Sequence, residues 1–151
     1  MGNRLRRLLP AVDVARRGEE TAAAELGRLR NQLAQHKARL GQLISFRTEY
    51  SRKLEVDGQR GLSVRSVQNV AGFVSNLDER IGQAGKESAS LNEQIDDQSR
   101  TWAAARARHQ ALLELLRRCR AEEGRIQDKR EQAASDEWSI RRYAMVKARS
   151  G

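Results

Sequence analysis

The sequence predicts an all-α fold, a two-helix antiparallel coiled-coil hairpin with a longer second helix. Three observations lead to this prediction: a helix-forming composition, two long seams of apolar residues at heptad spacing, and a glycine-containing break between them. Of the 151 residues, 32% are charged, only 4% are aromatic, and Pro10 is the single proline. Because Ala, Leu, Arg, Glu and Gln favour long helices, this composition indicates a coiled coil rather than a compact globule.

The first seam occupies the first third of the chain, where apolar residues recur at alternating steps of three and four, the a and d positions of a heptad. Twelve of its fifteen positions are apolar or Tyr, and the exceptions are Glu19, His36 and Arg47. Pro10 suits the first turn of a helix, so we expect a firm helix over about residues 11–55. The positions are Leu5, Leu8, Val12, Ala15, Glu19, Ala22, Leu26, Leu29, Leu33, His36, Leu40, Leu43, Arg47, Tyr50 and Leu54.

A break follows the first seam over residues 56–62, where two glycines occur and no apolar period is present. Glycine tolerates the positive φ that a tight reversal needs, so we expect the chain to fold back at Gly58. Ser63 is a favourable N-cap residue. We therefore expect a second helix over about residues 63–144.

The second seam keeps the heptad spacing unbroken, and seventeen of its 23 positions are apolar. A sustained a/d pattern of this length predicts a coiled-coil helix much longer than the first. The positions are Val67, Val70, Val74, Leu77, Ile81, Ala84, Ser88, Leu91, Ile95, Gln98, Trp102, Ala105, His109, Leu112, Leu116, Cys119, Glu123, Ile126, Arg130, Ala133, Glu137, Ile140 and Ala144.

A fold at Gly58 pairs residues whose numbers sum to 117, and every a position then faces a d position. This register places polar Glu19 opposite polar Gln98, a kind of pair that fixes register at some cost in stability. It also leaves an overhang of about residues 113–144 that no first-helix residue covers. The apolar stripe of the overhang favours a partner surface, with a frayed basic tail as the alternative.

Two aromatic residues lie off the seam near the expected turn. Phe46 and Phe73 both occupy g positions, and g faces g in an antiparallel pair. We expect them on the same side of the hairpin at similar height, bordered by seam residues. They are either anchors for a partner or a cover for a locally wider core, and the sequence leaves both readings open.

The net charge of +9 is concentrated at the two ends of the chain. Residues 1–50 and 101–151 each carry +5, whereas residues 51–100 carry −1, so a hairpin would gather the basic segments at one pole. A rod this basic would bind DNA in a salt-dependent way, which makes nucleic-acid binding one alternative function. Because acidic residues are interspersed and no recognition motif occurs, we expect no nucleic-acid partner.

The sequence carries no pattern typical of catalysis. Neither a phosphate-binding loop nor a zinc-type Cys/His spacing occurs. We read His36 and His109 as polar seam residues and Cys119 as a small apolar seam residue without a matching base. We therefore expect no enzyme activity, cofactor, metal or small-molecule substrate. The single cysteine and the lack of a signal peptide or of an apolar stretch long enough to span a bilayer favour the cytoplasm.

The chain resembles the FliJ family of bacterial flagellar type III export over nearly its whole length. The resemblance is carried by residues 43–50, by the Gly-containing turn with Phe73, Val74 and Leu77, and by residues 128–142 near the end. It implies a shape like the rotary stalk of F-type ATPases. It also implies binding in the hexameric export ATPase, contact with the cytoplasmic domain of the export-gate membrane protein, recycling of export chaperones, and a place in the cytoplasm at the inner face of the cell membrane.

The resemblance also implies two sets of binding residues. A surface near the turn would contact the export gate, and the pole with the termini would engage the ATPase. The equivalent stalk of a virulence type III secretion system is a close alternative, and a purely structural scaffolding coiled coil is another. The gate candidates are Leu43, Phe46, Tyr50, Phe73 and Leu77, and the ATPase candidates are Leu116, Ile126, Ala133, Trp138, Ile140, Arg141 and Arg142.

Overall fold

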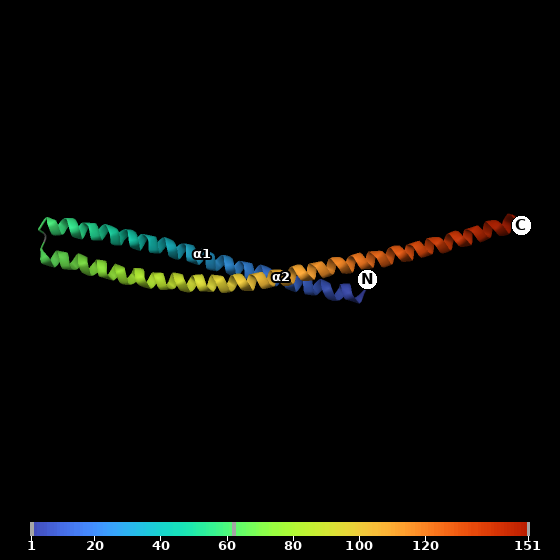
Figure 1. Ribbon diagram of the computed structural model, residues 1–151, viewed down its shortest axis with the longest axis horizontal. Helices are drawn as coiled ribbons and strands as arrows, with labels where there is room; N and C mark the ends of the chain where they lie inside the picture. Colours follow the sequence, from blue (N-terminus) through green and yellow to red (C-terminus); the bar gives the residue numbers. More distant parts are fainter. Residues whose placement is uncertain (1, 62, 151) are drawn as a thin grey trace. The chain divides into compact units, whose positions relative to one another are not determined.

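A computed structural model describes residues 2–61 and 63–150. Two helices make up almost all of this range: α1, Asn3–Gln59, and α2, Val64–Ser150 (Figure 1). No β-strand occurs in the described ranges. The predicted all-α class and the longer second helix are therefore confirmed.

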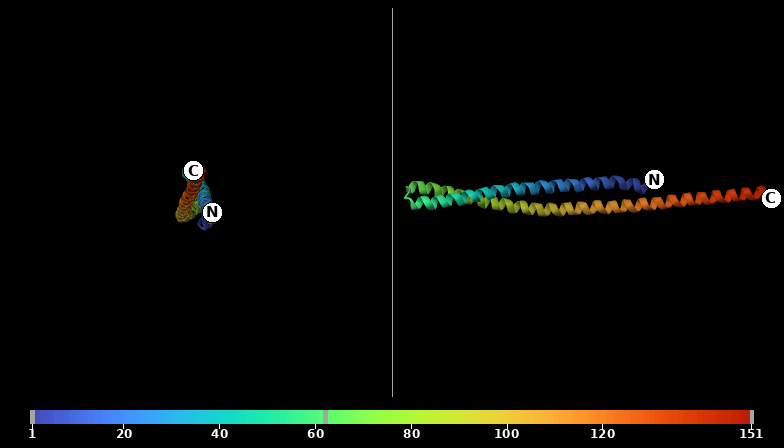
Figure 2. Two further views of the ribbon diagram at one scale, coloured as in Figure 1. Left: turned by 90° about the vertical axis from the view of Figure 1, so that its right-hand side faces the viewer. Right: turned by 90° about the horizontal axis from the view of Figure 1, so that it is seen from above.

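The described residues divide into two compact units, each built from one stretch of α1 and one stretch of α2. Unit 1 comprises residues 2–19 and 104–150, and unit 2 comprises Glu20–Ala103 with the turn. Within each unit, the paired stretches of the two helices lie side by side and run in opposite directions (Figures 1 and 2). This is the antiparallel arrangement that the heptad pattern predicts.

The predicted seams coincide with the buried stripes of the two helices. All fifteen positions of the first seam are described, and Arg47 is the one among them that is exposed. In the second seam every position through Glu123 is buried or half-buried, and every position from Ile126 onward is exposed. Each fully buried apolar side chain contributes roughly 1.5–3 kcal/mol, so the paired seam is the main favourable term that holds the helices together.

The end of α1 lies later in the chain than the sequence predicted. The helix continues through Gly58 to Gln59, and the N–H of Arg60 donates to the carbonyls of Val56 and Asp57, both at 3.2 Å. The expected reversal at Gly58 is therefore wrong. Helical hydrogen bonding persists there because glycine permits the helical conformation as well as the turn conformation.

The reversal uses the second glycine of the break, since Gly61 has a φ of 78°. Ser63 then begins α2 as predicted: its Oγ accepts the N–H of Ser66 at 3.3 Å, and its carbonyl accepts the N–H of Val67 at 3.1 Å. The bond from Ser66 satisfies one of the backbone donors that the first turn of a helix leaves without partners, and the bond from Val67 is the first i→i−4 bond of the helix.

The later turn changes the pairing register of unit 2. His36 Nε2 lies 2.8 Å from the carbonyl oxygen of Ala84, and Gln98 Nε2 lies 3.3 Å from that of Ala22. Both pairs have numbers that sum to 120 rather than 117. The predicted register is therefore wrong for these pairs, since the later turn places each α1 residue about three residues further along α2, slightly less than one helical turn.

The start of α1 also differs from the expectation. The helix begins at Asn3, which leaves Pro10 inside it rather than in its first turn. A proline inside a helix costs about 3 kcal/mol, since it cannot donate to the preceding turn. Leu5, Leu8 and Val12 pack against α2 on the first turns of this helix, and their burial offsets that cost.

Alanine substitution at the two glycines of the break should have opposite effects. Gly61→Ala should lower the free energy of unfolding by about 1–2 kcal/mol, because an L-residue at positive φ is strained. Gly58→Ala should raise it by about 0.5–1 kcal/mol, because Gly58 is helical and a Cβ there meets no described neighbour within 4 Å. Urea unfolding followed by circular dichroism measures both, and a stabilising Gly61→Ala would contradict this turn.

Candidate protein-binding surfaces

An aromatic pair marks the surface of unit 2 next to the turn. The rings of Tyr50 and Phe73 meet edge to face with centroids 4.7 Å apart and planes at 65°. Together with Asn69 and Val70 they line a hollow of about 240 Å³. Phe73 is 47% exposed, so its ring is available to a partner while one edge is held by Tyr50. An aromatic side chain fixed in this way is typical of an interface anchor.

The five gate candidates are not equally accessible. Phe46 is 50% exposed, Leu43 and Tyr50 are half-buried, and Leu77 is buried with 4% of its surface exposed. Leu77 therefore belongs to the core beneath the surface rather than to the surface itself. Among these candidates, the structure brings the rings of Phe73 and Tyr50 into direct contact. Pattern analysis missed Asn69, whose polar side chain at the rim carries no periodic signal.

An ion pair crosses between the helices beside this surface. Arg47 Nε donates to Asp78 Oδ1 at 2.6 Å, and this hydrogen bond raises the pKa of Arg47. Arg47 occupies a seam position, but its guanidinium extends out of the seam to water and to the carboxylate of Asp78. Such an exposed pair contributes little stability, and it is one polar contact between the two helices close to the aromatic pair.

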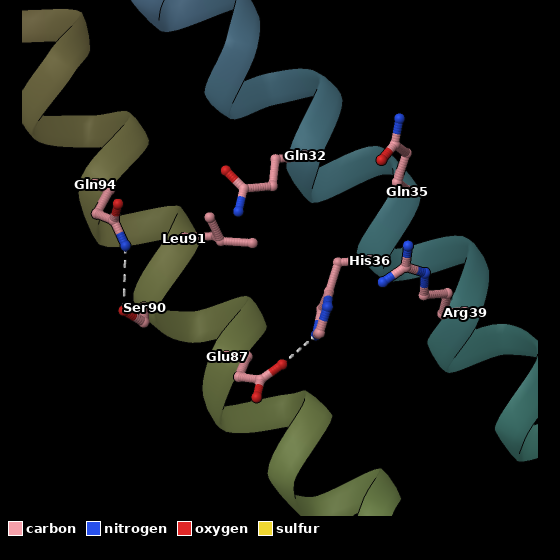
Figure 3. A pocket seen from close by; sticks show the side chains of 8 residues that line it. All are labelled: Gln32, Gln35, His36, Arg39, Glu87, Ser90, Leu91 and Gln94. Atoms are coloured by element: carbon pink, nitrogen blue, oxygen red, sulfur yellow. Dashed lines mark hydrogen bonds and ion pairs between the residues drawn. The ribbon is translucent and has the colours of Figure 1, made fainter.

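A polar hollow of about 360 Å³ lies further from the turn in unit 2 (Figure 3). His36 projects into it from α1, and its Nε2 carries the proton because it donates to the carbonyl of Ala84. Glu87 Oε2 lies 3.7 Å from the same nitrogen. The reading of His36 as a polar seam residue fits this geometry, in which its ring is satisfied by the facing helix.

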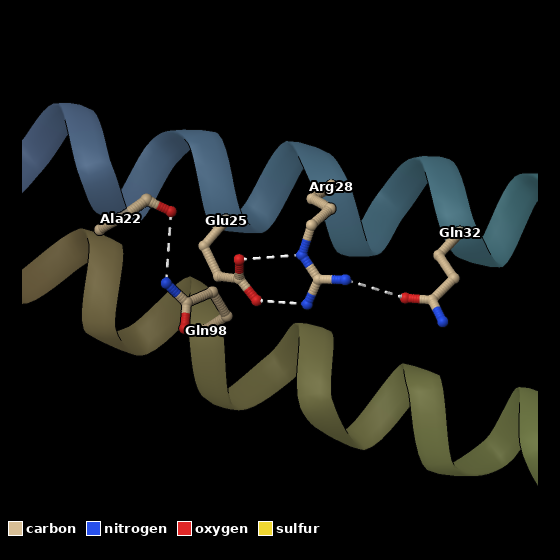
Figure 4. Close-up of polar contacts among 5 residues, drawn as sticks. All are labelled: Ala22, Glu25, Arg28, Gln32 and Gln98. Carbon is tan, nitrogen blue, oxygen red and sulfur yellow. Dashed lines mark hydrogen bonds and ion pairs between the residues drawn. The ribbon is translucent and has the colours of Figure 1, made fainter.

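Figure 4 shows a second set of polar contacts in unit 2, with one hydrogen bond across the seam and others along the flank of α1. Gln98 donates across the seam to the carbonyl of Ala22 at 3.3 Å. On the flank, Arg28 donates to both oxygens of Glu25 at 2.6 and 3.0 Å, and to Gln32 at 3.4 Å. The hydrogen bond from Arg28 lowers the pKa of Glu25, so this carboxylate stays charged in the paired state.

Unit 1 contains its own polar pair on the seam. His109 Nδ1 lies 2.5 Å from Glu19 Oε2, and both side chains are largely shielded from water. Glu19 was expected opposite Gln98, so this contact is a second correction of the register. The two polar seam residues satisfy each other, which avoids the cost of burying either one without a partner.

An apolar cluster closes the covered part of unit 1. Leu5 packs with Leu116 and Cys119, each 6–7% exposed, and Leu8 and Val12 lie against them. Leu116 was expected in the uncovered overhang and is instead buried. The cause is the changed register, which places Leu5 against Leu116 and Cys119 rather than opposite Leu112.

The uncovered tail of α2 begins after Glu123, whose Oε1 accepts the N–H of Gly2 at 3.1 Å. Every residue from Gly124 to Ser150 is exposed, and Figure 1 shows this stretch running past the N-terminal end of α1. We call residues 124–150 the tail. The remaining ATPase candidates all lie in it: Ile126, Ala133, Trp138, Ile140, Arg141 and Arg142.

Two side-chain contacts within the tail order its exposed tryptophan and arginines. Trp138 is 61% exposed, and the guanidinium of Arg142 lies 5.2 Å from the centroid of its ring. Arg141 donates to Glu137 at 2.8 Å. The cation–π contact covers one face of the indole and leaves much of it open, which suits a partner that presents both apolar and acidic groups.

Metal sites and membrane-spanning stretches are two further features that the described residues lack. No group of three or more His, Cys, Asp or Glu side chains in residues 2–61 and 63–150 could hold a metal ion. Neither helix, over its described length, has a stretch apolar and long enough to cross a membrane. The candidate sites are therefore the aromatic surface of unit 2 and the tail of unit 1.

The fold and these surfaces define an α-helical coiled-coil protein that presents aromatic and apolar side chains on two separate stretches. The description "Flagellar FliJ protein" matches residues 4–147, nearly the whole chain. The chain therefore belongs to the FliJ family and is a flagellar export-related protein. Comparison with curated proteins and with solved structures finds no significant match.

Removing the Leu5 side chain should open the apolar cluster of unit 1. Leu5→Ala should lower the free energy of unfolding by about 2–5 kcal/mol, because a buried leucine is lost and a cavity remains. It should also speed the reaction of Cys119 with a thiol reagent, since Leu5 covers that sulfur. The matched control is Leu9→Ala, whose side chain is 38% exposed and should change both readouts little. Equal labelling rates in the two variants would contradict the cluster.

Proposed function

We propose that this chain acts as a central-stalk-like activator of the hexameric flagellar export ATPase and couples it to the export gate. In this role the tail of unit 1 engages the ATPase, and the aromatic surface of unit 2 contacts the cytoplasmic domain of the export-gate membrane protein. The membership of the FliJ family favours the flagellar system over the equivalent stalk of a virulence secretion system.

The single observation that carries the ATPase assignment is the tail. An isolated helix in water is marginal, and most helical stability comes from packing of an apolar stripe. Here the seam continues through Ile126, Ala133 and Ile140 with no facing helix in the described chain. A partner that surrounds this stretch would bury those residues and gain the stabilisation that the first helix supplies up to Glu123.

The gate assignment is supported by the geometry of the aromatic pair. Tyr50 holds Phe73 edge to face, and Phe46 exposes half of its surface on the neighbouring turn of α1. A few rigid aromatic anchors of this kind usually supply most of the binding energy at an interface. Residues Leu43 and Leu77 would then support the anchors from below.

The rest of the proposal follows the family. The protein would help to recycle export chaperones and would work in the cytoplasm, peripherally associated with the cell membrane at the export apparatus. It would act by binding alone, without enzyme activity, cofactor or small-molecule substrate. Its activity would then depend on the two surfaces being present on one chain, because each would bind a different component.

Deleting the tail should abolish activation of the export ATPase. A chain that ends after Glu123 keeps every covered seam residue, so its paired helices should remain intact by circular dichroism. Full-length protein should stimulate ATP hydrolysis and ring assembly in a concentration-dependent way, and the shortened chain should do neither. Full stimulation by the shortened chain would exclude the tail as the activating element, and no stimulation by either would contradict the stalk function.

Removing the aromatic anchors should weaken binding to the export gate. The double variant Phe46→Ala/Phe73→Ala should bind the cytoplasmic domain of the gate protein about tenfold or more weakly, because hot-spot aromatics typically cost 2 kcal/mol or more on truncation. The control is Leu113→Ala in unit 1, where the side chain is 42% exposed but distant in sequence. Isothermal titration calorimetry compares the three proteins, and equal affinities would contradict the gate surface.

A further inference from the structure

Unit 1 has an apolar hollow that belongs neither to the tail nor to the aromatic surface. Its volume is about 330 Å³, and Val14 on its rim is 64% exposed. A Cβ built at Gly18 meets no described neighbour within 4 Å, so there is room above this glycine. The lining residues are Val14, Ala15, Gly18, Ala104, Ala105 and Arg108.

The hollow is one part of a longer strip on the same flank of unit 1. Apart from two seam alanines, its lining residues occupy c and g heptad positions, and residues seven apart at such positions share a flank. Ala11 continues the strip on α1, and Ala111 and Leu115 continue it on α2. Small side chains on both helices allow a third backbone to approach closely, as in helix-in-groove recognition.

The charges along this flank are almost all positive. Arg108 lines the hollow, and Arg4, Arg7 and Arg118 occupy c or g positions beyond it, against one acid, Glu122. Arg118 bonds to Glu114, and the bonds from Arg117 and Arg118 lower the pKa of that carboxyl to about 2.

The other three arginines keep their charge available. Within the described residues, Arg4, Arg7 and Arg108 have no acidic side chain at ion-pair distance. An arginine beside an exposed apolar surface is well suited to pair with a carboxylate of a docked partner, because it can donate two parallel hydrogen bonds.

We propose that this flank of unit 1 binds an amphipathic helix with acidic side chains, presented by a partner protein. The apolar face of that helix packs over Val14, Gly18 and Ala104, and its carboxylates pair with Arg4, Arg7 and Arg108. The result is a local three-helix bundle at a surface distinct from those of the proposed function.

Charge argues against a second copy of the chain as the occupant. Residues 2–19 and 104–150 together carry 17 Lys/Arg and 9 Asp/Glu, so the same unit of a second copy would bring like charge to the groove. Nucleic acid would match the arginines through its phosphates, but it would leave the apolar floor of the hollow uncovered.

The test uses a synthetic helical peptide of about six turns, roughly 22 residues, with an apolar stripe and glutamates on both sides of it. A twin peptide carries lysine at each glutamate position. Fluorescence anisotropy measures the binding of both peptides to the full-length protein. The glutamate peptide should bind at least tenfold more tightly than its twin, and added salt should weaken it.

Two variants locate the binding. Gly18→Leu fills the hollow where a side chain has room and should weaken the glutamate peptide about tenfold or more. The matched control is Gly82→Leu, on an exposed helical position of unit 2 that also has open space around it, and it should leave affinity unchanged. Arg108→Glu, which does not alter the packing of the seam, should favour the lysine twin.

Three outcomes would overturn the proposal. One is the absence of saturable binding, and another is equal affinity for the two peptides. The third is binding that Gly18→Leu and Arg108→Glu both leave unchanged. A single-stranded oligonucleotide that binds more tightly than the glutamate peptide, and equally to wild type and Gly18→Leu, would assign the flank to phosphate binding instead.

Discussion

The pairing of the two seams is the constraint on which the other features depend. Apolar a and d residues of α1 and α2 bury one another inside each unit, and this burial stops at Glu123 because α1 begins at Asn3. The register sets which residues are core and which are surface. It buries Leu116 and Cys119 beneath Leu5, and it leaves the same heptad pattern exposed from Ile126 onward. One packing interaction thereby creates both the paired helices of each unit and a stretch of α2 with no facing helix in the described chain.

Polar residues on the seam narrow the choice of register. Any shift by seven residues keeps apolar side chains facing each other, so burial alone distinguishes neighbouring registers poorly. In the observed register, His109 meets Glu19, His36 donates to the carbonyl of Ala84, and Gln98 donates to that of Ala22. A shift by seven residues would separate His109 from Glu19 and leave both polar side chains without this partner, at a cost of about 1–3 kcal/mol for each. The bonds of His36 and Gln98 go to main-chain carbonyls, which a shifted register would also present, so they satisfy these side chains without selecting the register. Among described residues that are not exposed, Ser88 has the one buried side-chain oxygen without a hydrogen-bond partner.

The sequence predicts those features that depend on local pattern. The all-α class, both seams up to Glu123 and the N-cap at Ser63 follow from heptad spacing and capping chemistry, and each is present. The features that it predicts wrongly are those that depend on the position of the turn. From the sequence alone, Gly58 and Gly61 are equally good candidates for the turn. Only the folded backbone shows that Gly61 takes the positive φ. The register and the start of the tail follow from the position of the turn. The contact of Phe73 with Tyr50 and the hollow at Gly18 depend on how side chains of the two helices lie against each other, which a single sequence does not show.

The central claim is that α1 covers the seam of α2 up to Glu123 and that the tail, as proposed, binds the export ATPase. Amide hydrogen exchange, measured along the chain with and without the ATPase ring, tests it most directly. In the free protein, slow exchange should extend through the covered seam and give way to fast exchange after about Glu123, because the tail lacks packing. Addition of the ring should slow exchange in the tail while the covered seam changes little. Protection that ends near Leu112 in the free protein, or a tail that exchanges equally fast with and without the ring, would contradict the account.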